Sequence, residues 1–178
     1  IDSLYKPRLL SYYRGSPGDT DMVYMTPVIF NTQTGEANRL DEFTNVNSTR
    51  FEWFPETGKA LILERERGYQ KISLYRYDAL TKSKDLLYTE SSETNIDNFN
   101  YRLEKTWNQV IFTSEKDGWK QLYTLDLKTK KVTRLTVGDY YINDISFVDK
   151  TTGDIFFTAK GKEGTNPYFD FAYKINVK

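Results

Sequence analysis

Apolar and polar residues alternate along most of this chain in short runs, which Gly, Asn, Asp and Thr interrupt. A period of two places successive side chains on opposite faces of a β-strand. Apolar residues at the helical spacing of three and four do not persist over any window longer than about ten residues. The 16% content of aromatic residues, spread among β-branched ones, suits half-buried strands. The pattern therefore predicts an all-β protein.

A strand followed by a turn recurs four times along the chain. Each copy is an apolar strand that ends at Asn31, Asp78, Asp126 or Asn176, so the copies lie 47, 48 and 50 residues apart. The first three copies carry Thr three residues later. An Asp or Asn side chain can accept hydrogen bonds from the backbone amides that follow it and close a turn. We therefore expect hairpins whose return strands cover 37–40, 86–89 and 132–135.

Two further strands precede each of the last three turns, so each unit contains four short strands in about 48 residues. Four antiparallel strands at this period are typical of a β-propeller blade. The predicted pairs cover 51–53 with 60–63, 99–101 with 109–113, and 145–147 with 155–158. We expect one propeller segment over 1–178, divided into a partial blade at 8–44 and blades at 45–92, 93–138 and 139–178. A β-sandwich or jelly roll stays open for any all-β chain, but neither explains the period.

The blade count predicts open edges. Propeller rings usually close with four to eight blades. This chain provides a partial blade followed by three nearly full ones, and the blade at the C-terminal end stops before its outer strand. Such an arc has an unpaired strand at each end, and unpaired strands recruit partners. We expect the isolated chain to self-associate through an end strand or to be only marginally stable.

Composition excludes several functional classes. Lys and Arg together number 25, as do Asp and Glu, so the formal net charge is zero. The chain therefore lacks the excess of positive charge expected of a nucleic-acid-binding protein. No apolar run approaches the roughly 20 residues of a membrane span. The chain has no Cys and no His, which removes disulfides, the usual zinc sites and the Ser-His-Asp and Cys-His arrangements. Catalysis within it would have to use carboxylates, Lys, Tyr or Ser.

Two equivalent loops join the second and third strands of successive blades, at Glu64–Tyr69 and Ser114–Trp119. Asp117-Gly118 is a strong turn dipeptide. Because the same element recurs at the same place, we interpret both loops as hairpins and not as recognition loops, and we expect the aromatic residue after Gly to pack between blades.

Other polar segments give no assignable site. Glu93, Asn95 and Asp97 within Ser91–Asn98 offer oxygen ligands suited to calcium, but their spacing matches no calcium loop. The Arg14–Asp19 segment lacks the Gly-x-Ser-x-Gly spacing of a nucleophile elbow. A glycosidase-type carboxylate pair requires a separation that the sequence does not give. We assign no catalytic, cofactor or metal residue, and substrate-binding residues stay unassigned.

Ser114–Tyr123 reads Ser-Glu-Lys-Asp-Gly-Trp-Lys-Gln-Leu-Tyr. This run is similar to the "SE-basic-DGW-x-x-LY" element of the dipeptidyl peptidase IV group, which belongs to the prolyl oligopeptidase superfamily. Leu135–Asp139 resembles its "LT-x-G-D/T-W-x-V" stretch, with Tyr140 in place of Trp. Phe51–Gly58 resembles the "W-x-P-D-G" entry into a blade, and Lys6–Asp19 resembles the opening of an earlier blade.

The resemblance implies a division of labour. In that group an N-terminal propeller covers a C-terminal α/β-hydrolase domain that carries Ser, Asp and His, and it limits access to short peptides or unstructured ends. The propeller also supplies a Glu pair for the substrate's amino terminus, on a helical insertion that would precede Lys6. The group places an Arg near the start of the blade that here contains Phe99, but 94–100 contains none. No binding residue is therefore transferred.

We accordingly expect a non-catalytic part of a peptidase propeller. The parent would be a serine exopeptidase that cleaves after Pro or Ala near the N-terminus of peptides, in the periplasm or another extracytoplasmic compartment, as the resemblance alone implies. The chain begins at Ile1 instead of Met, as a processed or excised segment would. The alternative is a stand-alone propeller that binds proteins or glycans, because fold alone does not choose between functions.

Overall fold

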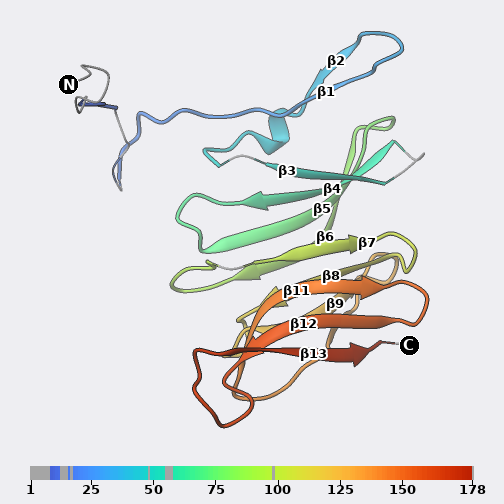
Figure 1. Cartoon of the computed structure of the whole chain (residues 1–178). Helices are drawn as coiled ribbons and strands as arrows, with labels where there is room; N and C mark the ends of the chain where they lie inside the picture. The colour runs from blue at the N-terminus through green and yellow to red at the C-terminus, as the bar shows by residue number, and fades with distance from the viewer. Residues whose placement is uncertain are drawn as a thin grey trace, which may run out of the picture.

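The computed structural model describes residues 9–12, 16, 18–47, 49–54, 58–97 and 99–177. Within these ranges the chain forms thirteen strands in four antiparallel sheets, which follow one another in chain order (Figure 1). The first sheet is the hairpin of β1 (Val28–Phe30) and β2 (Ala37–Arg39). A short 3₁₀ turn, η2 (Asp41–Phe43), leads from it to the second sheet.

The second and third sheets each have four strands that pair in chain order. The second contains β3 (Arg50–Phe54), β4 (Lys59–Arg65), β5 (Lys71–Asp78) and β6 (Ser83–Ser91). The third contains β7 (Tyr101–Glu104), β8 (Gln109–Ser114), β9 (Gln121–Asp126) and β10 (Val132–Arg134). The fourth contains β11 (Tyr141–Asp149), β12 (Asp154–Lys160) and β13 (Asp170–Asn176).

This architecture confirms the predicted all-β partial propeller. Within the described residues the four sheets have two, four, four and three strands, so two blades have all four strands. One backbone hydrogen bond recurs in the last three sheets and shows that they are structural copies. The residue after the third strand donates to the turn between the first two strands: Ala79 to Gly58 at 2.9 Å, Leu127 to Asn108 at 3.0 Å, and Val177 to Gly153 at 3.0 Å. The division at 44/45, 92/93 and 138/139 stays a prediction.

The predicted turn chemistry is present in the first three copies. Side-chain oxygens of Asn31, Asp78 and Asp126 each accept two backbone hydrogen bonds, from the residues two and three positions later, at 2.7 to 3.2 Å. In the fourth copy Asn176 acts differently: its amide donates to the Thr152 carbonyl at 2.9 Å and to Asp154 Oδ1 at 2.7 Å.

Apolar side chains pack between successive sheets, so every sheet shares a core with the next. Ile29, Leu40 and Phe43 pack onto Ala60 and Ile62 of β4. The largest core joins the second and third sheets, and a further core joins the third and fourth. Apolar and polar side chains alternate along the strands, so the apolar ones face these cores. This is why the sequence period of two predicted the strands.

Two local expectations were wrong. The first strand of the third sheet begins at Tyr101 and not at Phe99, because Phe99 packs into the core before the ladder starts. Tyr69 and Trp119 are 44% and 50% exposed, so the aromatic residue after Gly is only partly covered and is not buried between blades.

Some predicted segments lie outside the described residues. These are Pro55–Thr57 of the expected turn before β4, and Lys6–Arg8, Tyr13–Gly15 and Pro17 of the expected earlier blade. Among the described residues, no helix is long and apolar enough to cross a membrane.

Candidate binding pocket between the second and third sheets

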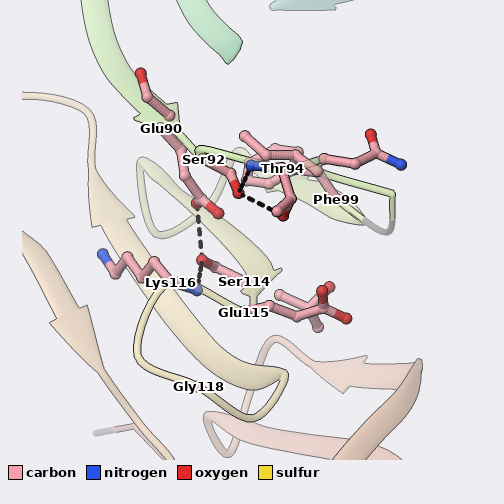
Figure 2. A pocket seen from close by; sticks show the side chains of 12 residues that line it. Glu90, Ser92, Thr94, Phe99, Ser114, Glu115, Lys116 and Gly118 are labelled. Atoms are coloured by element: carbon pink, nitrogen blue, oxygen red, sulfur yellow. Dashed lines mark hydrogen bonds between the residues drawn. The ribbon is translucent and has the colours of Figure 1, made fainter. Parts of the chain in front are cut away.

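A pocket of about 400 Å³ lies where the second sheet meets the third (Figure 2). Its walls come from the end of β6, the linker from β6 to β7, the end of β8 and the hairpin turn from β8 to β9. The volume falls in the range of small-ligand sites. Twelve residues line it: Glu90, Ser91, Ser92, Thr94, Asn95, Ile96, Phe99, Thr113, Ser114, Glu115, Lys116 and Gly118.

Glu90 lines the pocket and joins the two sheets. The residue is 8% exposed. Its Oε2 accepts a hydrogen bond of 2.7 Å from the Tyr88 hydroxyl. It accepts another of 2.7 Å from the Ser114 hydroxyl, which Figure 2 shows. Both bonds are to a charged acceptor, the stronger class of protein hydrogen bond. Glu90 is therefore held in one orientation by a residue of its own sheet and one of the next.

Ser114 connects this carboxylate to the hairpin turn. While its hydroxyl donates to Glu90, its oxygen accepts the backbone N–H of Lys116 at 3.1 Å, as Figure 2 shows. The Gly118 N–H donates to the Glu115 carbonyl at 2.9 Å, and Gly118 has a φ of 101°, which favours glycine. The turn that the sequence predicted at Ser114–Trp119 thus also forms one wall of the pocket.

The linker that forms the opposite wall is fixed by three bonds to the second sheet. The Gln70 carbonyl accepts a hydrogen bond of 2.9 Å from the Ser92 N–H. The Gln70 side-chain Nε2 donates a hydrogen bond of 2.8 Å to the Glu93 carbonyl. The Ile96 N–H donates to the Tyr69 carbonyl at 2.7 Å. The pocket is consequently bounded by hydrogen-bonded backbone at Ser92, Glu93 and Ile96 on this side and at the β8–β9 turn on the other.

Aromatic rings surround the buried end. Phe99, which lines the pocket, lies 5.4 Å from Phe112 and 6.3 Å from Tyr88 between ring centroids. Burial is the main cause that raises the pKa of Tyr88 far above its usual value, and the hydrogen bond to Glu90 adds to it. Tyr88 therefore stays protonated at neutral pH and donates to Glu90.

Lys116 is the basic residue of the lining, but its ammonium is engaged elsewhere. The Nζ atom lies 4.5 Å from the ring centroid of Tyr123 and 5.4 Å from that of Tyr88. These are cation–π distances. In Figure 2 its side chain runs away from Thr94 and Phe99. Glu115, in contrast, is an exposed lining residue.

In the part of the chain that the structure describes, the polar segment at 91–98 that the sequence singled out lines this pocket without forming a metal site. Within 91–98, Asn95 donates its Nδ2 to Asp97 Oδ1 at 2.8 Å, so these two side chains satisfy one another. No group of three or more acidic side chains placed to hold a metal occurs among the described residues. Sequence reasoning missed Glu90, because this residue lies just beyond the return strand expected at 86–89, whereas β6 extends to Ser91.

Comparison with known proteins places the chain in a family. The profile of the family described as the dipeptidyl peptidase IV (DPP IV) N-terminal region matches residues 17–178. Dipeptidyl peptidase 4 of Porphyromonas gingivalis is similar with a TM-score of 0.71 and 15% identity, over 85% of this chain and 22% of that chain. A Bacteroides ovatus protein assigned as a dipeptidyl aminopeptidase IV is similar with a TM-score of 0.64 and 20% identity, over 85% of this chain and 24% of that chain.

A third solved structure, TolB from Acinetobacter baumannii, is similar with a TM-score of 0.53 and 17% identity, over 85% of this chain and 35% of that chain. At these identities the structural likenesses show the fold alone, and the chain spans about a quarter of the two peptidase chains. The family profile, however, covers nearly the whole sequence. The chain therefore belongs to the dipeptidyl peptidase IV N-terminal region family, as the motif at Ser114–Tyr123 predicted.

Proposed function

We propose that this chain is a non-catalytic part of the propeller of a serine exopeptidase, where it gates substrate access to an α/β-hydrolase domain of the same parent protein. The family match over residues 17–178 carries the proposal. Two similar structures are named as dipeptidyl peptidases and are about four times as long as this chain, which leaves room for a further domain. The parent would cleave after Pro or Ala near the N-terminus of peptides.

The absence of histidine supports assigning the chemistry to another part of the parent. Serine peptidase chemistry requires a general base beside the nucleophile, and His fills that role in the Ser-His-Asp arrangement. The complete sequence of this chain contains no His and no Cys. The chain would accordingly act through shape and contact, as a wall and a docking surface for the hydrolase domain.

Hydrolysis of alanyl-prolyl p-nitroanilide tests the catalytic half of the proposal. The full-length parent should release p-nitroaniline, and the 178-residue chain alone should not. Activity in the chain alone, retained after repurification, would show that the chain is itself an enzyme. If the parent also fails to hydrolyse this substrate and related dipeptidyl anilides, the peptidase assignment is wrong and a stand-alone binding propeller takes its place.

A size series tests the gating half. We expect kcat/KM of the parent to fall steeply from a short Ala-Pro peptide to a folded protein that carries the same flexible Ala-Pro terminus. A peptide of similar mass but without stable structure is the control, because it can thread through a narrow opening. Equal rates for the folded and unfolded substrates would contradict gating.

The resemblance also supports an extracytoplasmic location for the parent, which we include in the proposal. Cell fractionation with an antibody against this chain checks it. Recovery of the parent with cytoplasmic markers after osmotic shock would refute the location without affecting the peptidase assignment.

A further inference from the structure

We propose that the pocket between the second and third sheets binds a lysine or arginine side chain of a peptide, with Glu90 recognising its positive charge. This inference rests on the geometry of the pocket and does not require the parent to be a peptidase. The ligand class follows from three features of the lining: a buried carboxylate with one unoccupied oxygen, a basic neighbour directed elsewhere, and an apolar wall.

The hydrogen bonds of Glu90 are all on one oxygen. Oε2 accepts from Tyr88 and from Ser114, each at 2.7 Å, whereas within the described ranges no donor or cation pairs with Oε1. Glu90 is a buried residue, 8% exposed, and it lines the pocket. Oε1 is not among the fully buried atoms that lack a hydrogen-bond partner, so it keeps some accessible surface. A charged donor is the strongest hydrogen-bond partner for a carboxylate. Oε1 therefore presents an unused acceptor to a ligand in the pocket.

The basic residue of the lining does not neutralise this carboxylate. Lys116 makes no ion pair within 4 Å of Glu90, and its ammonium faces the rings of Tyr88 and Tyr123. Glu115 adds a second carboxylate to the lining, and in the described part of the chain it forms no hydrogen bond or ion pair through its side chain. The field inside the pocket thus favours a cation.

The shape favours an organic cation with an apolar stem. Ile96 and Phe99 are buried apolar residues of the lining, and hydroxyls of Ser92 and Thr94 lie nearer the exposed side. Lysine and arginine combine a hydrocarbon stem with a charged head, so the stem can pack on Ile96 and Phe99 while the head reaches Glu90. A divalent metal would need several oxygen ligands, and the described residues provide no group of three acidic side chains.

Ligand-observed NMR on the full-length parent tests the proposal with three blocked peptides. The probes are acetyl-Gly-Arg-Gly-amide, acetyl-Gly-Lys-Gly-amide and acetyl-Gly-citrulline-Gly-amide. Acetylation removes the terminal amine, so a site for free amino termini does not contribute. Citrulline keeps the shape of arginine without its charge. We expect the two cationic peptides to bind about tenfold more tightly than the citrulline peptide, the ratio that corresponds to one charge-assisted hydrogen bond.

Paired substitutions locate the site. Glu90→Gln keeps an amide oxygen for Tyr88 and Ser114 and should abolish the preference for charge. Glu93→Gln is the matched control, because it removes the same charge from an exposed neighbour that does not line the pocket, and it should leave the preference intact. Melting curves verify that both variants are folded.

A third variant separates an external ligand from internal neutralisation. Lys116→Gln removes the one positive charge of the lining and should strengthen binding of the arginine peptide. If the unaltered protein shows no charge preference and Lys116→Gln creates one, Lys116 occupies the pocket in solution and the proposal is wrong. A preference that survives Glu90→Gln would also overturn it. Failure of either kind leaves hydrolysis of the dipeptidyl anilide unchanged, so it is distinct from failure of the peptidase assignment.

Discussion

The Nζ of Lys130 lies 2.6 Å from Oδ1 of Asp85, and this contact joins the turn after β9 in the third sheet to β6 in the second. Arg76 contacts the other oxygen of the same carboxylate at 2.8 Å. The hydrogen bond from Lys130 is the main cause that lowers the pKa of Asp85 below its ordinary value. The pair is therefore a polar link between two blades whose main contact is an apolar core.

A double-mutant cycle with Asp85→Asn and Lys130→Met should give a coupling free energy of about 0.5–1 kcal/mol at pH 7. The estimate is small because Asp85 and Lys130 keep 37% and 43% of their side chains exposed, where solvent screens the attraction. Urea unfolding of the four proteins measures it. Asp41→Asn is the control, because its pair with Arg39 is far more exposed and lies beside a single hairpin. Equal effects at Asp85 and Asp41 would contradict a link between blades.

The same link predicts a dependence on pH. The folded-state pKa of Asp85 lies below that of the unfolded chain, so its contribution to stability is present in full above about pH 4, the usual pKa of Asp. The contribution falls as the pH drops through the lower folded-state value. The unaltered protein should thus lose more stability between pH 5 and pH 3 than Asp85→Asn does. Parallel acid losses in the two proteins would argue against the pair.

The recurring hairpin predicts a stabilising substitution. Lys82 has a φ of 56°, and Gly35 occupies the corresponding position of the first hairpin with a φ of 75°. Left-handed backbone strains a residue that has a Cβ atom, so Lys82→Gly should raise the free energy of unfolding by about 0.5–1 kcal/mol. Lys128→Gly, at a turn position without positive φ, should not stabilise. Chemical denaturation compares the two; a loss of stability in Lys82→Gly would show that the turn is not strained.

A second glycine prediction concerns the stretch after β10. A Cβ atom on Gly138 would lie 2.6 Å from Cε1 of Tyr140, which is 7% exposed and fixed in the core between the third and fourth sheets. Gly138→Ala should therefore destabilise the protein by about 1–3 kcal/mol. Gly118→Ala is the control, since its φ is also positive but the space around it is open. If both variants lose the same stability, backbone strain and not the Tyr140 ring is responsible.

The sequence predicted the repeated parts of this fold because local chemistry determines them. Asp78 and Asp126 close their turns with neighbouring backbone amides, so the turns were readable without knowledge of distant residues. The predicted start of β7 was wrong because Phe99 does not belong to the strand ladder. Its apolar side chain is needed for packing against Tyr88 and Phe112 in the core.

The pocket could not be read in the same way, because its parts are separated in sequence and meet only when the sheets pack. Glu90 and Ser114 are 24 positions apart and lie on different sheets. The loop at Ser114–Trp119 was correctly interpreted as a hairpin, yet that interpretation does not reveal that Ser114 also bonds a carboxylate of the preceding blade. A turn whose local hydrogen bonds explain its sequence can therefore also form one wall of a binding pocket.

The predicted self-association now has a specific strand. Among the described residues β13 has one hydrogen-bonded neighbour, β12. The Val177 N–H donates to Gly153 on that side, so by alternation the N–H groups of Ala172 and Lys174 point to the open side. We expect the isolated 178-residue chain to form dimers that increase with concentration, because an open strand pairs readily with another copy.

Ala172→Pro tests this edge directly, because it removes an outward N–H without removing a bond to β12. Sedimentation velocity over a range of concentrations should show dimers in the unaltered chain and mainly monomers in Ala172→Pro. Ala172→Val is the control, since it keeps the N–H and favours a strand, and it should still dimerise. Dimers that persist in Ala172→Pro would place the interface elsewhere, with the β1 side of the first hairpin as the next edge to block. A chain that stays monomeric at every concentration would refute association through open strands, and the limit on its stability would then come from the packing between sheets alone.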